Sequence, residues 1–135
     1  MLPTIKTDIQ NLKFDVNELP SLTHRMILDR EIINGKIDKL DAMRQLIYKV
    51  LNTERYEYII YSWNYGIELV DLIGQDKDYV VAVLPKRISE ALKQDDRITN
   101  VDGFEFDTSQ KRIVQCTFTV HTIYGDIEAE REVNY

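Results

Sequence analysis

The clearest periodic pattern in the chain is an apolar stripe at helical spacing that begins just after Asp38. Its members are Leu40, Met43, Leu46, Ile47, Val50 and Leu51. This spacing places all six side chains on one face of a helix. Asp38 is suited to cap that helix through its carboxylate, and Asp41 adds a favourable negative charge in the first turn. The pattern predicts a first long helix that ends near Asn52.

A second helical stripe follows, and it contains a proline. The apolar positions are Val80, Val81, Leu84, Ile88, Ala91 and Leu92. They predict a helix that is capped by Asp76 or Asp78 and runs to about Asp95. Because proline inside a helix loses a hydrogen bond and clashes with the preceding turn, we expect a kink or a new start at Pro85.

The C-terminal third alternates between apolar and polar residues, as half-buried strands do. In one run Val114, Cys116, Phe118 and Val120 face inward, and Gln115, Thr117, Thr119 and His121 face outward. The segment 98–106 precedes this run across the turn residues 107–110, which predicts an antiparallel hairpin. Gly125-Asp126 is expected to turn the chain into a third strand at the edge of the sheet. There Ile127, Ala129 and Val133 face the core, and Glu128, Glu130 and Glu132 share the other face.

The remaining segments have weaker patterns. Residues 1–20 lack a sustained period and predict an extended N-terminal arm. Asn34-Gly35 lies between short apolar runs and predicts a β-hairpin or β-turn. The aromatic and β-branched residues of 56–73 favour short extended pieces, with a bend at Gly66 and a helical turn in 68–73. The fold class is therefore α+β: residues 21–135 form a single domain in which a small antiparallel sheet packs with two main helices.

Composition narrows the classes of function. The formal charge is −6, and no basic run stands out, so nucleic acid is not an expected partner. Cys116 is the single cysteine, and the N-terminal sequence lacks the basic start and apolar core of a signal peptide, so we expect a cytoplasmic protein. The longest uncharged run, 58–67, is too short to span a membrane.

Motifs for catalysis or cofactor binding are not found in the sequence. It has no glycine-rich phosphate loop, no Cys-x-x-Cys pair and no His-Glu-x-x-His, so we expect no cofactor and no metal. Glu54 with Glu57, or the glutamate row of the last strand, offers a paired-carboxylate arrangement for glycoside hydrolysis. A row of glutamates at period two is more typical of a solvated or ion-pairing strand face. A non-enzymatic protein is the main expectation, and a peptidoglycan hydrolase is the alternative.

The stretch Thr53–Leu69 joins an adjacent acid and base, Glu54 and Arg55, to a run of aromatic residues that ends at Tyr65-Gly66. Because the charged pair follows the first helix, it is placed to hold a turn or to reach a partner. The aromatic residues favour packing in the core or in an interface over a platform for a small ligand. The segment is interpreted as a docking element.

Several motifs in the same order resemble those of one family. INGKIDKLDAMRQLIYKVLNTERYEYIIYSWNYGIELVDLIG, EALKQDDRI and FTVHTIYGDIEAE closely resemble the XkdS family of PBSX-like prophage tail proteins, over roughly residues 20–133. That family is similar to the gene 25-like baseplate proteins of contractile phage tails. In those proteins a Glu-Pro-Arg or Glu-Arg motif follows the first long helix and precedes a Tyr-Gly or Phe-Gly turn. Here Glu54 and Arg55 match the motif, without the proline, and Tyr65 and Gly66 match the turn.

The resemblance implies a structural role in the tail baseplate of a phage or of a tail-like bacteriocin particle that is made in the host cytoplasm. Glu54, Arg55, Tyr65 and Gly66 would dock the protein to the baseplate wedge. The expected partners are wedge proteins and the tail sheath protein, with tube or hub proteins as further candidates. The protein would start the sheath by sharing β-strands with it. The strand expected to contact the sheath comprises Ile127, Glu128, Ala129, Glu130, Arg131, Glu132 and Val133.

Overall fold

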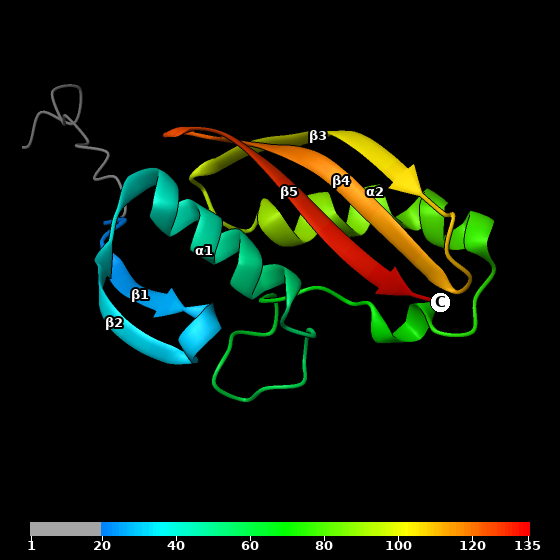
Figure 1. Ribbon diagram of the computed structural model, residues 1–135, viewed down its shortest axis with the longest axis horizontal. Helices are drawn as coiled ribbons and strands as arrows, with labels where there is room; N and C mark the ends of the chain where they lie inside the picture. The colour runs from blue at the N-terminus through cyan, green and yellow to red at the C-terminus, as the bar shows by residue number, and fades with distance from the viewer. Residues whose placement is uncertain (1–19) are drawn as a thin grey trace, which may run out of the picture.

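A computed structural model describes residues 20–135, so the arm expected over residues 1–20 lies almost entirely outside the described part. The order of the main elements is β1 (Thr23–Ile27), β2 (Ile32–Ile37), α1 (Lys39–Leu51), α2 (Lys77–Leu92), β3 (Ile98–Asp107), β4 (Ile113–Thr122) and β5 (Gly125–Asn134). Strands β3, β4 and β5 form one antiparallel sheet, and β1 pairs with β2 in a separate one. Figure 1 shows both long helices beneath the larger sheet, which confirms the predicted α+β class.

The core lies between the two helices and the inner face of the three-stranded sheet. Its fully buried members include Met43 of α1, Leu84 and Ile88 of α2, and Val114 and Val120 of β4. Each of these residues belongs to an apolar set that the sequence pattern assigned to the inward face. Burying a side chain of this size stabilises the fold by about 1.5–3 kcal/mol, so these two helical faces and one strand face determine the packing.

The cap of α1 is the one expected from the sequence. The Asp38 carboxylate accepts a hydrogen bond from the Lys39 N–H at 2.7 Å, and the Ser21 hydroxyl donates to the same carboxylate. The second helix, α2, continues through Pro85, so of the two alternatives predicted there, a kink or a new start, the new start is wrong. Leu84 and Ile88 on either side of the proline are fully buried. Their burial offsets the loss of one backbone hydrogen bond.

The β1–β2 hairpin is present, but its turn is not at Asn34-Gly35. The chain reverses at the short 3₁₀ turn Leu28–Arg30, followed by Glu31 with φ 53°. Asn34 and Gly35 lie within β2, where the pairing shifts register between His24 and Met26. Gly35 has φ 75°, and it forms a bulge within the strand.

The three-stranded sheet has one irregular edge and one regular edge. Strand β4 lies in the middle, with β3 and β5 at the edges, which confirms the edge position predicted for β5. The β3–β4 pairing shifts register twice, whereas β5 pairs with β4 continuously from Gly125 to Asn134. The turn between β4 and β5 is formed by residues 123–124, so the turn predicted at Gly125-Asp126 is wrong by two residues.

The outer face of the sheet carries a histidine held by two carboxylates. His121 Nε2 lies 2.8 Å from Asp102 Oδ1, and its Nδ1 lies 2.7 Å from Asp126 Oδ1. The three residues belong to β4, β3 and β5, so this cluster links all three strands. The hydrogen bond to Asp102, followed by the one to Asp126, raises the pKa of His121 above its usual value.

A His121→Gln variant will remove a pH-dependent part of the stability. Because the pKa of His121 is raised on folding, its contribution is complete below the unfolded value of about 6.5 and is lost as the pH rises through the folded value. Thermal unfolding between pH 5.5 and about pH 8.5 measures this loss. Identical profiles for the unmodified protein and His121→Gln would contradict the assignment.

Candidate functional site

The segment that follows α1 folds into a loop that returns to its own starting point. The extended pieces expected over 56–73 are absent, and the backbone between Tyr56 and Gly66 consists of turns. A single parallel bridge joins Glu54 to Ile67. The Ile67 N–H donates to the Thr53 carbonyl at 3.0 Å, and the Arg55 N–H donates to the Ile67 carbonyl at 3.2 Å. These bonds close the base of the loop.

Glu54 fixes the chain after the loop. Its carboxylate accepts hydrogen bonds from the Leu69 N–H at 3.1 Å and from the Val70 N–H at 3.2 Å. These donors lie at the start of the 3₁₀ turn Val70–Leu72. Such N–H groups have no partner within their own turn, so the carboxylate caps it. The helical turn expected in 68–73 is therefore present, and Glu54 supplies its cap.

Arg55 fixes the other end of the loop. Its side chain is only 9% exposed, and both Nε and Nη2 donate to the Gly66 carbonyl, at 3.3 and 3.2 Å. Its Nη1 lies 3.3 Å from Glu90 Oε1 on α2. Glu54 therefore holds the 3₁₀ turn after the loop, and Arg55 holds the end of the loop itself. Glu54 and Arg55 are neighbours in the sequence, and both side chains form hydrogen bonds to backbone groups of the chain itself.

Tyr65 and Gly66 complete the loop base. Tyr65 is partly buried and stacks on Tyr61, with ring centroids 4.3 Å apart. Burial, together with the nearby Tyr61, raises the pKa of Tyr65. Gly66 has φ +94°, and a Cβ atom there would lie 2.5 Å from the Thr53 carbonyl oxygen. The four residues predicted to act together, Glu54, Arg55, Tyr65 and Gly66, are thus assembled in one place.

The tip of this loop carries a group of exposed apolar side chains, which we call the aromatic loop. Its members are Tyr56, Tyr58, Ile59, Ile60 and Trp63. Ile59 is fully exposed and Trp63 is 75% exposed, so packing in the core is excluded for both side chains. Ile59 and Ile60 were not singled out in the sequence. The signal was that they are adjacent, because two neighbours on a strand cannot both face the core.

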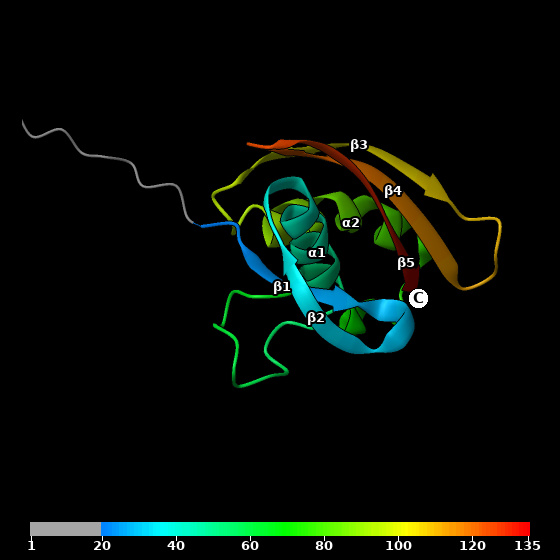
Figure 2. The ribbon, with the colours of Figure 1, turned by 60° about the vertical axis from the view of Figure 1, so that its left-hand side comes forward.

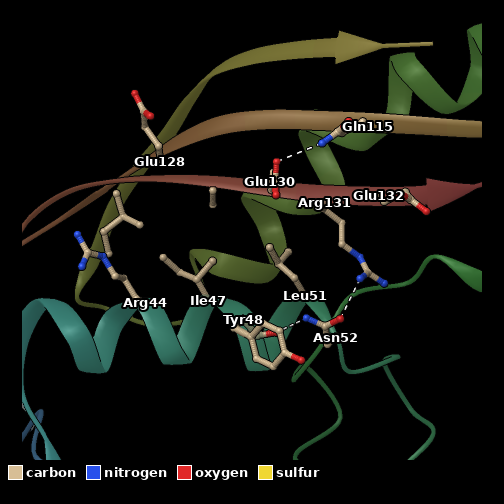
Figure 3. A pocket seen from close by; sticks show the side chains of 12 residues that line it. Arg44, Ile47, Tyr48, Leu51, Asn52, Gln115, Glu128, Glu130, Arg131 and Glu132 are labelled. Carbon is tan, nitrogen blue, oxygen red and sulfur yellow. Dashed lines mark hydrogen bonds between the residues drawn. The ribbon is translucent and has the colours of Figure 1, made fainter. Parts of the chain in front are cut away.

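A second feature is an open groove between α1 and the edge strand β5, with a volume of about 490 Å³. Figure 3 shows Ile47 and Leu51 pointing from α1 toward β5, and Tyr48 of α1 also lines the groove. At one end of the groove Arg131 Nη1 donates to Asn52 Oδ1 at 2.9 Å. The groove has an apolar floor and a polar rim, and it runs along the strand that was predicted to contact a partner.

The backbone of β5 has unused hydrogen-bonding groups along this groove. The Tyr135 N–H donates to the Arg112 carbonyl on the β4 side at 3.1 Å. Because the pairing of β5 is regular and an antiparallel ladder alternates, the odd-numbered residues bond to β4. The N–H and C=O groups of Glu128, Glu130 and Glu132 therefore point away from β4. No other strand lies on that side in the part of the chain that the structure describes.

Within residues 20–135 the structure shows no group of three or more His, Cys, Asp or Glu side chains arranged to hold a metal ion. Burial raises the pKa of the Cys116 thiol to about 11, so this cysteine is protonated at neutral pH. Among the described helices, none has the length and apolar character needed to cross a membrane. The features that stand out are the exposed aromatic loop, and the β5 edge with its groove.

Comparison with known proteins identifies the family of the chain. Residues 10–125 match the model of the family described as contractile injection system sheath initiator. The chain is also 40% identical over 105 residues to the phage-like element PBSX protein XkdS of Bacillus subtilis (strain 168), covering 76% of this chain and 74% of that protein. The family match spans α1, the loop base, α2, β3 and β4, and it ends at the first residue of β5. The chain belongs to the contractile injection system sheath initiator family.

Proposed function

We propose that this sheath initiator links the baseplate wedge to the first ring of the sheath, and that it holds the sheath by sharing β-strands. The observation that carries the proposal is the regular, unblocked edge of β5 beside a groove. The family is a structural one, and both candidate surfaces suit protein partners. The two surfaces come from different parts of the chain, so one molecule has room for two partners.

The sheath contact is assigned to the strand residues 127–133. An incoming strand gains backbone hydrogen bonds from the free groups of β5, and its alternate side chains enter the groove above α1. Figure 2 shows β5 at the rim of the sheet, with α1 below it. The opposite edge, β3, has register shifts on both sides of Val101 and Asp102, and such bulges disturb pairing. Strand addition is therefore directed to β5.

The wedge contact is assigned to the aromatic loop together with its base. Glu54, Arg55, Tyr65 and Gly66 contribute by fixing the loop, because their bonds lie within the chain. The exposed apolar side chains at the tip then contact the wedge protein. Large apolar side chains that are exposed in the free chain are typical of the centre of protein interfaces.

An Ile59→Ser, Ile60→Ser variant will lose binding to the wedge protein and keep binding to the sheath protein. The two exposed isoleucines contribute apolar area only when a partner covers them, so a loss of roughly 100-fold in wedge affinity is expected. Pull-down with each purified partner measures both arms. A matched control is Ile32→Ser, Ile33→Ser, which changes another adjacent and exposed isoleucine pair on the β1–β2 hairpin. Equal loss in both variants would contradict the assignment to the loop.

The position of the chain in the particle tests the function as a whole. Electron cryomicroscopy of intact particles should show it between the wedge and the first sheath ring, with a sheath strand beside β5. Density at any other level of the tail would overturn the proposed link.

A further inference from the structure

We propose that the strand added to β5 is a segment of a partner protein in which lysine or arginine alternates with small or medium apolar residues. This inference rests on the proposed strand sharing and goes further, because it specifies the chemistry of the partner segment. Three features of the described structure carry it: the charge of the outer sheet face, the direction of the free backbone groups, and the apolar floor of the groove.

The outer face of the three-stranded sheet is strongly acidic. The register places seven carboxylates there: Asp102, Glu105 and Asp107 on β3, and Asp126, Glu128, Glu130 and Glu132 on β5. The outward positions of the three strands include no lysine or arginine. His121 binds two of these carboxylates, and Gln115 donates to Glu130 at 3.1 Å. The glutamates of β5 lie at the open edge, so a partner meets them first.

The free backbone groups of β5 belong to these same glutamates. A residue that forms a hydrogen-bonded pair with Glu128, Glu130 or Glu132 places its side chain on the same outer face, about 5.5 Å away between Cα atoms. Opposite charges at directly paired positions stabilise a sheet, and like charges destabilise it. Lysine or arginine is therefore favoured at each of these three positions.

The intervening residues of the incoming strand face the other way, toward the groove. Its floor includes Ile47, Tyr48 and Leu51 of α1 and the small Ala129 of β5. Arg131 lies at one end, held by Asn52, and its buried Nε has no acceptor in the described chain. Apolar side chains of small or medium size match this floor. A period of two between basic and apolar residues follows directly from the alternation of the strand.

The same arrangement disfavours a second copy of this chain as the occupant. Pairing of β5 with β5 would place the glutamate row of one copy against that of the other. Like charges directly opposite each other destabilise the pair. The edge is therefore open to a basic strand and protected against self-association, which otherwise threatens an uncovered edge.

The test uses three carrier fusions, and each displays a nine-residue strand with valine at the inward positions. The outward positions are all lysine in the first fusion, all threonine in the second and all glutamate in the third. Each is titrated into the isotope-labelled full chain and followed by the backbone amide signals of β5. The lysine strand should bind about tenfold more tightly than the threonine strand, and the glutamate strand should not bind. The advantage of lysine should shrink in about 0.5 M salt, because exposed charges are screened.

A set of variants identifies the charges responsible. The triple variant Glu128→Gln, Glu130→Gln, Glu132→Gln should bind the lysine strand and the threonine strand with equal affinity. The control variant Asp29→Asn, Asp78→Asn, Asp96→Asn removes the same total charge at exposed sites away from the three-stranded sheet and should keep the preference for lysine.

The possible outcomes distinguish a failure of the basic-strand inference from a failure of strand sharing. Equal affinity of the lysine and threonine strands for the unmodified chain, with shifts in β5, would overturn the basic-strand inference and leave strand sharing intact. Tighter binding of the glutamate strand would also overturn it. If no strand shifts the amides of β5, strand sharing itself fails, and with it the link proposed to the sheath.

Discussion

Replacing Gly66 with alanine will lower the free energy of unfolding by about 3 kcal/mol. Two costs combine at this position. The backbone has φ +94°, a region that alanine rarely adopts, and the new Cβ would lie 2.5 Å from the Thr53 carbonyl oxygen. That oxygen accepts the hydrogen bond from Ile67 that closes the loop base, so it is not free to move away. Thermal and denaturant unfolding measure the effect, and the thermal midpoint should fall by about 10 °C.

Gly74 supplies a matched control for this prediction. It also has a positive φ, +88°, but a Cβ atom there meets nothing within 4 Å. Gly74→Ala should therefore cost only the strain of the backbone, about 1 kcal/mol. The difference between the two variants isolates the close approach of Gly66 to Thr53. If both variants lose the same stability, the close approach contributes nothing, and the account of the loop base is wrong.

The Gly66 variant also separates loop structure from loop contact. The apolar side chains of the aromatic loop are unchanged in Gly66→Ala, but their positions depend on the loop base. If wedge binding falls in a folded Gly66→Ala protein, the loop acts through its fixed shape. In the Ile59→Ser, Ile60→Ser variant the base is intact and only the contact is lost. The two variants together distinguish positioning residues from contacting ones.

The helices and the C-terminal strands could be predicted from the sequence because local pattern and tertiary burial agree there. The stripe after Asp38 is buried as expected, with Met43 and Ile47 in the core, and the alternation around Phe118 gives the inward face of β4. In these segments the periodicity alone determines which side faces the core. The prediction of α+β architecture followed from these few elements.

The turns and the aromatic loop could not be placed with the same success. Asn34-Gly35 has the composition of a hairpin turn, but a nearby 3₁₀ turn reverses the chain and the glycine serves a bulge. The aromatic residues after Tyr56 have strand propensity. The hydrogen bond of Arg55 to Gly66 and its ion pair with Glu90 nevertheless hold the segment in a loop. Hydrogen bonds and ion pairs between residues far apart in sequence do not produce a periodic pattern of apolar residues, so the periodicity cannot predict them.

The candidate site was predicted in part. The adjacency of Glu54 and Arg55 at a helix exit indicated that they would hold a turn or reach a partner. Both side chains bind backbone groups within the chain, and contact with a partner stays a prediction. Their separate partners were not visible, because the Leu69 N–H and the Gly66 carbonyl are backbone groups that any sequence supplies. Similarly, the glutamate row of β5 predicted an outward face. Only the register between β4 and β5 shows that the free N–H and C=O groups belong to the same glutamates.

Replacing Glu130 with proline will abolish incorporation of the sheath protein and leave the domain folded. Proline has no N–H group, and the Glu130 N–H points to the open edge, so the pairing with β4 loses no backbone hydrogen bond. An added strand, in contrast, loses a central hydrogen bond and meets the proline ring. Sheath assembly from purified sheath protein, seeded by this chain and its wedge, should fall at least about 100-fold, since strand addition depends on backbone bonding.

The control for this prediction is Glu130→Thr, which removes the charge and keeps the N–H. If strand addition operates, the threonine variant seeds the sheath with only a modest loss, because one charge pair contributes a few tenths of a kcal/mol to about 1 kcal/mol. Wedge binding should be unchanged in both variants, since the aromatic loop is intact. Normal seeding by a folded Glu130→Pro protein would show that β5 does not receive a strand, and the sheath contact would then have to lie on another surface.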